Sequence, residues 1–236
     1  MTFVSVRRAV QVPVVVAMVG IVACASTSTP PPAPPAAPVS QDKVLLDDEF
    51  SEYRAQWRQV RGQWAVQNGQ VVQTRDDPRE QNTIMFYDPL TIADAEVTTG
   101  VTMLARLPQF QTPDDKELLE TRRRIAGAGL VFRYQDENNY YMFRLAGEEG
   151  AVLGKMQDGQ WTDLANPRAA DFASGSRIRV DTEYTLRVRT QGRRIQTWVN
   201  NRAVANLEDG TFSTGRVGLA AFRTQAAFSS IRVVER

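Results

Sequence analysis

The fold class of this chain is decided by residues 129–145, which read GLVFRYQDENNYYMFRL. Two runs rich in aromatic and β-branched residues, Ala128–Tyr134 and Tyr140–Leu145, are separated here by a short polar stretch that contains Asp and Asn. Short runs of this composition, bounded by turn-forming residues, are typical of β-strands. The stretch therefore predicts two neighbouring strands.

The same pattern continues in both directions and covers residues 44–236. Many short strands at this spacing indicate an all-β sandwich or barrel. The further predicted strands are Val44–Phe50, Gln63–Gln67, Val71–Thr74, Thr83–Tyr87, Glu96–Leu104, Ala151–Met156, Tyr184–Thr190, Arg194–Val199, Val217–Phe222 and Phe228–Val234.

Three dipeptides between these runs predict tight hairpin turns. They are Asn68-Gly69, Asp158-Gly159 and Asn200-Asn201. Gly takes a positive φ without steric cost, and Asn and Asp tolerate it better than other residues, as two-residue hairpin turns require.

One segment departs from the strand pattern and predicts a short inserted helix over Pro113–Arg124. Thr112 is a suitable N-cap, and Pro113 is favoured at the first helical position. Glu120 and Arg124 are four residues apart, which allows an ion pair on one helix face. The arginines of this helix form either a solvated face or a partner contact.

The order of segments resembles the concanavalin A-like jelly roll, and most closely its laminin-G-like members, including domains assigned to the 3-keto-disaccharide hydrolase family. The resemblance covers roughly residues 44–236 and implies a two-sheet antiparallel jelly-roll sandwich with one concave sheet. It rests mostly on core and turn residues, which specify a fold better than a function. The segments that carry it are Asp48–Phe50 with Trp57, Gly62–Val66, Asn68–Val72, Gly129–Tyr134, Asn138–Arg144, Gly192–Asn201, Gly215–Leu219 and Ala227-Phe228.

The N-terminal residues 1–23 have the organisation of a signal peptide. Arg7 and Arg8 precede the apolar run Ala9–Val22, which is shorter than the roughly 20 residues of a membrane-spanning helix. The run ends in Ile21-Val22-Ala23-Cys24, which resembles the lipobox of bacterial lipoproteins. That resemblance implies cleavage before Cys24 and attachment of a diacylglycerol to its thiol.

Residues 24–43 follow as the lipidated cysteine and a linker. Ala25–Ser40 holds six of the 12 prolines, which favours an extended, semi-rigid spacer. We therefore expect an exported protein that is anchored to a membrane of the bacterial cell envelope. If the organism is Gram-negative, the non-acidic Ala25 implies the outer membrane.

Alternation of side chains along strands predicts a carbohydrate-binding face. Tyr141, Phe143 and Leu145 are expected to face the core, which leaves their neighbours outward. An exposed aromatic ring stacks on sugar C–H groups, and polar neighbours bind hydroxyls. The alternative is that loops cover these residues. The candidate binding residues are Trp198, Gln196, Tyr140, Arg144 and Arg133, while Trp57, Trp64 and Trp161 are expected to be structural.

The amino-acid composition excludes several classes of catalytic and metal-binding site. The chain has no histidine, which excludes Ser-His and Cys-His nucleophile systems and histidine-ligated zinc. A net charge of +1 gives no indication of nucleic-acid binding. Glycoside hydrolysis needs only two carboxyl groups. The closely spaced pairs Asp47/Glu49 and Asp181/Glu183 lie near strand starts, where acidic residues usually serve turns.

No cofactor or metal is expected. Many jelly rolls of this type hold a calcium ion with an acidic residue soon after the final Phe, but Ser229 and Ser230 follow Phe228 here. The leading hypothesis is a membrane-anchored lipoprotein that presents a carbohydrate-binding sandwich to an oligosaccharide or polysaccharide. A glycoside hydrolase of the 3-keto-disaccharide type and an envelope protein-interaction module are the alternatives.

Overall fold

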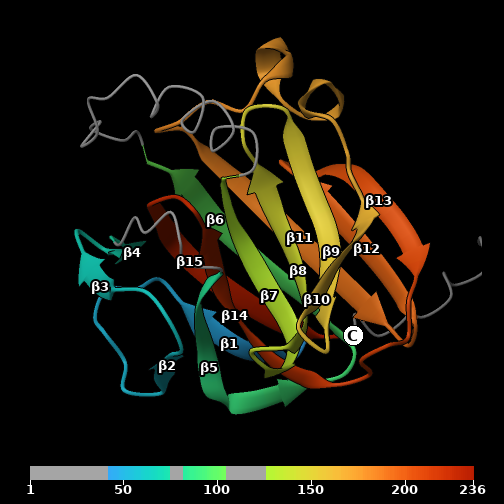
Figure 1. The fold of residues 1–236 in the computed structure, drawn as a ribbon. Coiled ribbons are helices and arrows are strands. Elements are labelled where there is room, and N and C mark those ends of the chain that lie inside the picture. Colours follow the sequence, from blue (N-terminus) through green and yellow to red (C-terminus); the bar gives the residue numbers. More distant parts are fainter. Residues whose placement is uncertain (1–41, 75–81, 105–125) are drawn as a thin grey trace, which may run out of the picture. The chain divides into compact units, whose positions relative to one another are not determined.

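The computed structural model describes residues 42–74, 82–104 and 126–236, all within the compact unit Gln41–Arg236 (Figure 1). The helix expected at Pro113–Arg124 lies outside these residues. In the described part of the chain, the only helical segments are the 3-10 turns η1 (Ala169–Asp171) and η2 (Ser174–Ser176). None of the described helices is long and apolar enough to span a membrane.

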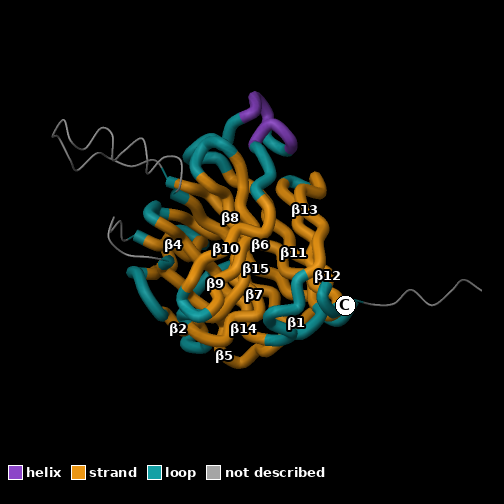
Figure 2. Tube along the Cα trace, turned by 45° about the vertical axis from the view of Figure 1, so that its right-hand side comes forward, coloured by secondary structure: helices purple, strands orange, loops and turns teal. Residues whose placement is uncertain are grey.

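The described residues form two antiparallel sheets that pack face to face as a sandwich (Figures 1 and 2). The eight-stranded sheet runs in the order β13-β12-β11-β6-β15-β4-β3, with β1 also paired to β15. Its strands are β1 (Val44–Asp48), β3 (Trp64–Gln67), β4 (Gln70–Gln73), β6 (Ala95–Met103), β11 (Glu183–Gln191), β12 (Arg194–Val199), β13 (Arg202–Glu208) and β15 (Ala226–Glu235).

The seven-stranded sheet runs in the order β10-β9-β8-β7-β14-β5-β2. The predicted all-β, two-sheet antiparallel sandwich is thereby confirmed. The strands of this sheet are β2 (Trp57–Gln59), β5 (Thr83–Ile92), β7 (Gly127–Asp136), β8 (Asn139–Ala146), β9 (Gly150–Gln157), β10 (Gln160–Ala165) and β14 (Gly215–Phe222).

The main hydrophobic core lies between the two sheets, and alternation along the strands builds it. On β8, the side chains of Tyr141, Phe143 and Leu145 are fully buried in this core. On β11, Leu186 and Val188 point into it from the opposite sheet. The prediction that Tyr141, Phe143 and Leu145 face the core is confirmed.

The three predicted hairpin turns are also confirmed. Asn68-Gly69, Asp158-Gly159 and Asn200-Asn201 connect β3 to β4, β9 to β10 and β12 to β13. Both central residues of each turn have a positive φ, between 48° and 77°. These turns bring neighbouring strands into register, because a two-residue turn of this kind matches the twist of the strands that it joins.

A second apolar layer covers the outer face of the seven-stranded sheet. The rings of Phe86, Tyr134 and Tyr140 stack in a row across β5, β7 and β8, with centroids 5.0 and 5.9 Å apart. Tyr140 and Met142 face away from the main core as predicted, and they are covered rather than exposed. Each keeps only 1% of its surface exposed, because side chains such as Trp161 pack over this layer.

Arg133 is not an outward residue of this sheet. Its φ is +47°, and a register shift between β7 and β14 places one extra residue in β7 at this point. Val131 and Tyr134 consequently share the outer layer although they are three positions apart. The Arg133 guanidinium is fully buried and donates to the carbonyl oxygens of Ala93 and Phe212 at 3.0 and 2.9 Å. Because of the bulge, Arg133 is a buried residue that links backbone segments by hydrogen bonds, and it is not available on the surface to bind carbohydrate.

Candidate functional site

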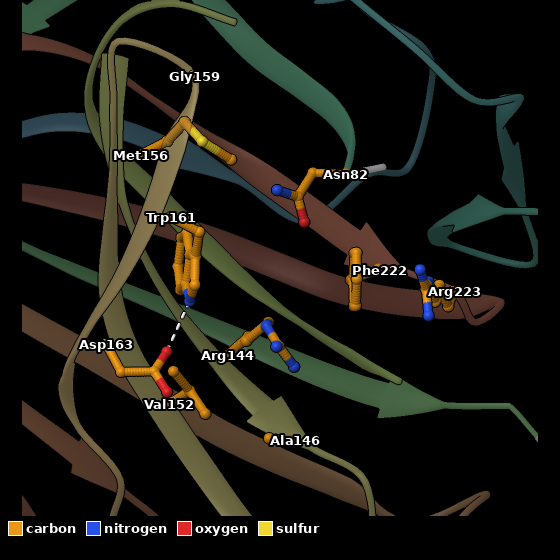
Figure 3. Close-up of a pocket in the computed structure, with 10 residues that line it drawn as sticks. All are labelled: Asn82, Arg144, Ala146, Val152, Met156, Gly159, Trp161, Asp163, Phe222 and Arg223. Carbon is orange, nitrogen blue, oxygen red and sulfur yellow. Dashed lines mark hydrogen bonds between the residues drawn. The ribbon is translucent and has the colours of Figure 1, made fainter. Parts of the chain in front are cut away.

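A cavity of about 530 Å³ opens on the outer face of the seven-stranded sheet, beside the second apolar layer (Figure 3). This volume lies within the range of small-molecule binding sites. Both apolar and polar side chains line it, as is typical of such sites. The lining residues are Asn82, Arg144, Ala146, Val152, Met156, Gly159, Trp161, Asp163, Phe222 and Arg223.

One wall of the cavity is the indole ring of Trp161 on β10. Its Nε1 donates a hydrogen bond of 2.6 Å to Oδ1 of Asp163, two residues along the same strand and on the same face (Figure 3). Oδ2 of Asp163 accepts a hydrogen bond of 3.3 Å from Nδ2 of Asn166. Both carboxylate oxygens of Asp163 are therefore engaged, and the indole is held in one orientation.

The opposite wall is built around the Phe222 ring at the end of β14. The guanidinium carbons of Arg144 and Arg223 lie 5.1 and 5.0 Å from its centroid, and Figure 3 shows the ring between the two. Both distances fall within the range of cation–π contact. The wall thus presents two cations supported by one aromatic ring.

Arg144 is the more buried of the two cations, with 9% of its surface exposed. Burial lowers the pKa of its guanidinium to about 10, although the charge of Asp163 and the hydroxyl of Tyr140 oppose this change. At neutral pH the side chain is still positively charged. It brings a poorly hydrated cation to the lining of the cavity.

Asn82 connects the cavity to the aromatic row below it. Its Nδ2 donates a hydrogen bond of 2.6 Å to the hydroxyl of Tyr140. Burial raises the pKa of Tyr140 to about 12, so the hydroxyl stays protonated at physiological pH. Tyr140 accordingly supports the cavity from beneath without lining it.

The structure separates the five residues predicted to bind carbohydrate. Arg144 lines the cavity and Tyr140 underlies it. Trp198 and Gln196 lie on β12 of the other sheet. The Trp198 ring is half-buried there, with the guanidinium carbon of Arg187 4.3 Å from its centroid. The expectation that these residues share one face with Arg133 is wrong, because the strands belong to different sheets and Arg133 points inward.

Sequence reasoning missed the residues that complete the cavity. Trp161 was expected to be structural, and Asn82, Asp163, Phe222 and Arg223 were not singled out. A usable signal was present on β10, where Trp161 and Asp163 follow the Asp158-Gly159 turn at alternating positions of one strand. The missing information was that β10 lies at the edge of the sheet, next to β9.

The described residues contain no cluster of three or more Asp, Glu, His or Cys side chains placed to hold a metal ion. Within the cavity they provide one carboxylate, Asp163. The arrangement offers an aromatic wall, two cations and hydrogen-bonding groups around a space of ligand size.

No family model and no curated protein matches this chain in sequence. Solved structures do match its fold. The carbohydrate-binding module CBM66 from Bacillus subtilis superposes with a TM-score of 0.61 at 20% identity, over 76% of this chain and 96% of that one. A Bacillus subtilis protein of unknown function with a galectin-like fold gives 0.58 at 12% identity, over 82% and 96%.

A β-glucanase from Bacillus licheniformis also matches, with a TM-score of 0.54 at 8% identity, over 82% of this chain and 99% of that one. At these identities the matches establish the fold. The chain has a concanavalin A-like β-sandwich, the fold that it shares with these structures.

Proposed function

We propose that this domain binds a carbohydrate in the cavity on the outer face of the seven-stranded sheet. The observation that carries the proposal is the oriented indole of Trp161, which faces a cavity that also contains Asp163 and Arg144. An aromatic face receives the C–H surface of a sugar ring, and charged or polar groups around it bind hydroxyls. The fold of a carbohydrate-binding module supports the same conclusion.

The test compares Trp161→Ala with Trp198→Ala on a glycan array, followed by calorimetry with the glycans that bind. We expect Trp161→Ala to weaken binding at least about tenfold, a loss of about 1.4 kcal/mol. Trp198→Ala should stay within about twofold, since its ring is stacked on Arg187 in the other sheet. Thermal unfolding checks that both variants are folded.

Two results would contradict the proposal. If Trp198→Ala abolished binding and Trp161→Ala did not, the site would lie on the eight-stranded sheet. If the folded wild type bound no glycan on a broad array, carbohydrate binding itself would be refuted.

We further propose that the protein is a bacterial lipoprotein, exported and anchored through Cys24, with residues 25–43 as the spacer. The support is the order of positive residues, apolar run and cysteine in residues 7–24. A diacylglyceryl cysteine carries two acyl chains, which suffice for stable anchoring. Metabolic labelling with palmitate should mark the wild type and not Cys24→Ala. Equal labelling of both would rule out the anchor.

The second candidate is a glycosidase, including one of the 3-keto-disaccharide type, because Asp163 places a carboxylate in the cavity. Glycoside hydrolysis requires a second carboxyl group. The purified domain, incubated with bound glycans and with 3-keto-glycosides, should release no reducing sugar. Release that Asp163→Asn abolishes would favour the enzyme.

A further inference from the structure

We propose that the outer face of the eight-stranded sheet docks an acidic segment of a partner protein, and that Arg187 and Trp198 bind its carboxylate. This face lies on the opposite side of the sandwich from the cavity, so the inference is independent of the proposed carbohydrate site (Figure 1). Three features carry it: a stacked arginine and tryptophan, a guanidinium that shares its nearest carboxylate with two others, and a mixture of charges around them.

Arg187 on β11 and Trp198 on β12 are directly opposite each other in the strand ladder. Their neighbours Leu186 and Val199 are buried in the main core, so alternation places the pair on the outer face. The guanidinium carbons of Arg187 and Arg189 lie 4.3 and 5.8 Å from the centroid of the Trp198 ring. Tryptophan and arginine are the residue types in which the energetically dominant positions of protein interfaces are enriched. A pair that is already stacked also loses less conformational entropy on binding.

Arg187 shares its nearest carboxylate with two other arginines. Its Nη1 lies 4.0 Å from Oε1 of Glu96, a long distance for an ion pair. Arg189 donates hydrogen bonds of 2.8 and 2.5 Å to Oε2 of Glu96, and Arg236 donates one of 3.0 Å to Oε1. Burial alone would raise the pKa of Glu96, but these hydrogen bonds outweigh it and hold this pKa below its usual value. The ionised Glu96 is therefore bound mainly to the other two guanidinium groups.

An excess of positive charge remains at Arg187. Arg236 has a second carboxylate partner in Asp42, at 2.6 Å. The cluster thus holds three guanidinium groups and two carboxylates, which leaves one positive charge in excess. In the part of the chain that the structure describes, Nε of Arg187 is buried without a hydrogen bond, while 27% of the side chain is exposed. A carboxylate that approached its terminal nitrogens would neutralise the cluster, and guanidinium matches the planar carboxylate by donating two parallel hydrogen bonds.

Charges of both signs surround this cluster, which favours a protein over a polyanion. Asp47 on β1 is 48% exposed and pairs with Arg232, at 2.6 Å. On β13, the exposed Glu208 lies opposite Arg194. An anionic membrane or an acidic polysaccharide presents negative charge across the whole contact, so these carboxylates would repel it. A protein segment can place one carboxylate at Arg187 and neutral or basic groups elsewhere.

The probe is a library of random short peptides displayed on phage. It is selected on the chain from residue 24, with Cys24→Ala so that no lipid is attached. Clones that bind the wild type are counter-selected against Arg187→Gln, and the survivors are synthesised with a fluorescent label. We expect the survivors to share an Asp or Glu. Its replacement by Asn or Gln should weaken binding at least about tenfold, as measured by fluorescence anisotropy.

Variants of the face show whether that carboxylate binds at Arg187. Arg187→Gln and Trp198→Ala should each weaken the selected peptides at least about tenfold. In Arg187→Gln, replacing the acidic residue of the peptide should change affinity by less than about twofold, because its charge partner is already gone. Arg187→Lys keeps the charge and loses the planar fork, so its affinity should be intermediate. This variant also tests the site if Arg187→Gln does not fold.

Two matched controls locate the effect. Arg194→Gln removes the same charge from an exposed position on β12, where Arg194 donates a hydrogen bond to Asn206. Trp161→Ala removes a tryptophan from the cavity on the other sheet. Both should bind the selected peptides within about twofold of the wild type. Thermal unfolding confirms that each variant is folded.

The outcomes are decisive for the inference. It is overturned if a folded wild type enriches no peptide, if the survivors lack an acidic residue, or if Arg194→Gln loses as much affinity as Arg187→Gln. Phosphatidylglycerol vesicles and oligogalacturonate are tested in parallel. If either bound more tightly than every selected peptide and depended on Arg187, the face would belong to a membrane or an acidic glycan, and the protein partner would be refuted. Glycan binding that depends on Trp161 is a separate result, which none of these outcomes changes.

Discussion

The indole of Trp161 rests directly on Gly154 of the neighbouring strand. A Cβ atom on Gly154 would lie 2.3 Å from Cζ2 of Trp161 and 2.7 Å from the carbonyl oxygen of Thr162. Neither distance is tolerable, and one of the atoms belongs to the backbone of β10. The close approach of β9 and β10 therefore depends on the absence of a side chain at this position.

Gly154→Ala is expected to displace Trp161 and the edge strand β10. Overpacking of this kind costs about 1–3 kcal/mol of stability. Because the wall of the cavity moves, glycan affinity should fall together with stability, and the near-ultraviolet circular dichroism of tryptophan should change. The measurements are denaturant unfolding and calorimetric titration.

Gly210→Ala is the matched control. The atoms nearest to a Cβ there belong to the flexible side chain of Arg193, at 3.0 Å or more. Stability and binding should both remain close to wild type. Wild-type affinity in Gly154→Ala would show that Trp161 does not form part of the binding site.

Local chemistry explains which parts of the fold were predictable. The Asn68-Gly69 turn needs a positive φ at two successive residues, and Asn and Gly are the residue types that adopt this conformation most readily. Alternation along β11 and β12 likewise separates Leu186 and Ile195 from Arg187 and Trp198. In each case, the residue and its immediate neighbours contain the information.

The cavity depends on relationships that are distant in the chain. Asn82, Arg144, Trp161 and Phe222 meet because β8 pairs with β9 and β9 with β10, while β14 and β5 lie beyond β7 in the same sheet. Alternation assigns a side chain to one face of a strand, and it does not identify the sheet that contains the strand. This is why Trp198 and Arg144 were grouped on one face. The bulge at Arg133 also changes which face of the sheet the following side chains of β7 point to, whereas simple alternation assumes that no such change occurs.

Asp48 is expected to be a major determinant of stability near the N-terminal strand. It is 1% exposed, and its two oxygens accept hydrogen bonds of 2.9 Å from the amide of Phe50 and from Nε1 of Trp57. Asp48→Ala leaves both donors buried and unpaired, and should lower the free energy of unfolding by about 2–4 kcal/mol. Urea denaturation measures the loss.

The neighbouring Asp47→Ala is the control for Asp48. Asp47 forms an exposed ion pair with Arg232, at 2.6 Å. Such pairs contribute about 0–1 kcal/mol. Equal losses from the two substitutions would contradict the role assigned to Asp48.

The lowered pKa of Asp209 predicts that the protein loses stability at acidic pH. Burial alone would raise the pKa of Asp209, but hydrogen bonds from Lys155, Thr211 and Tyr141 outweigh it and hold this pKa well below its usual value. A carboxyl group whose pKa is depressed by folding stabilises the protein above its unfolded pKa of about 3.9. That contribution is lost as the pH falls below this value.

We therefore expect the free energy of unfolding of the wild type to decline below about pH 4, and Asp209→Asn to show a shallower decline. At neutral pH, Asp209→Asn should be less stable by about 1–3 kcal/mol, because Lys155 loses its charged partner. Parallel pH profiles for the two proteins would show that another carboxyl group is responsible.

The raised pKa values of three buried tyrosines predict a second loss of stability, at alkaline pH. Burial raises the pKa of Tyr134, Tyr140 and Tyr141 to about 12 in each case, and the hydrogen bond to Asp209 adds to the effect at Tyr141. In the unfolded chain, tyrosine ionises near pH 10. The folded state thus retains more protons than the unfolded state between these values. Its stability is complete below about pH 10 and is lost as the pH approaches 12.

Titration of phenolate absorbance tests this directly. In denaturant, all 6 tyrosines should ionise together near pH 10. In the folded protein, three should ionise only near pH 12, in step with unfolding, and Tyr140→Phe should reduce that group to two. This variant should also release Asn82 from its hydrogen bond at the edge of the cavity, with a modest loss of glycan affinity. A single transition near pH 10 in the folded protein would contradict the burial of the aromatic row that supports the cavity.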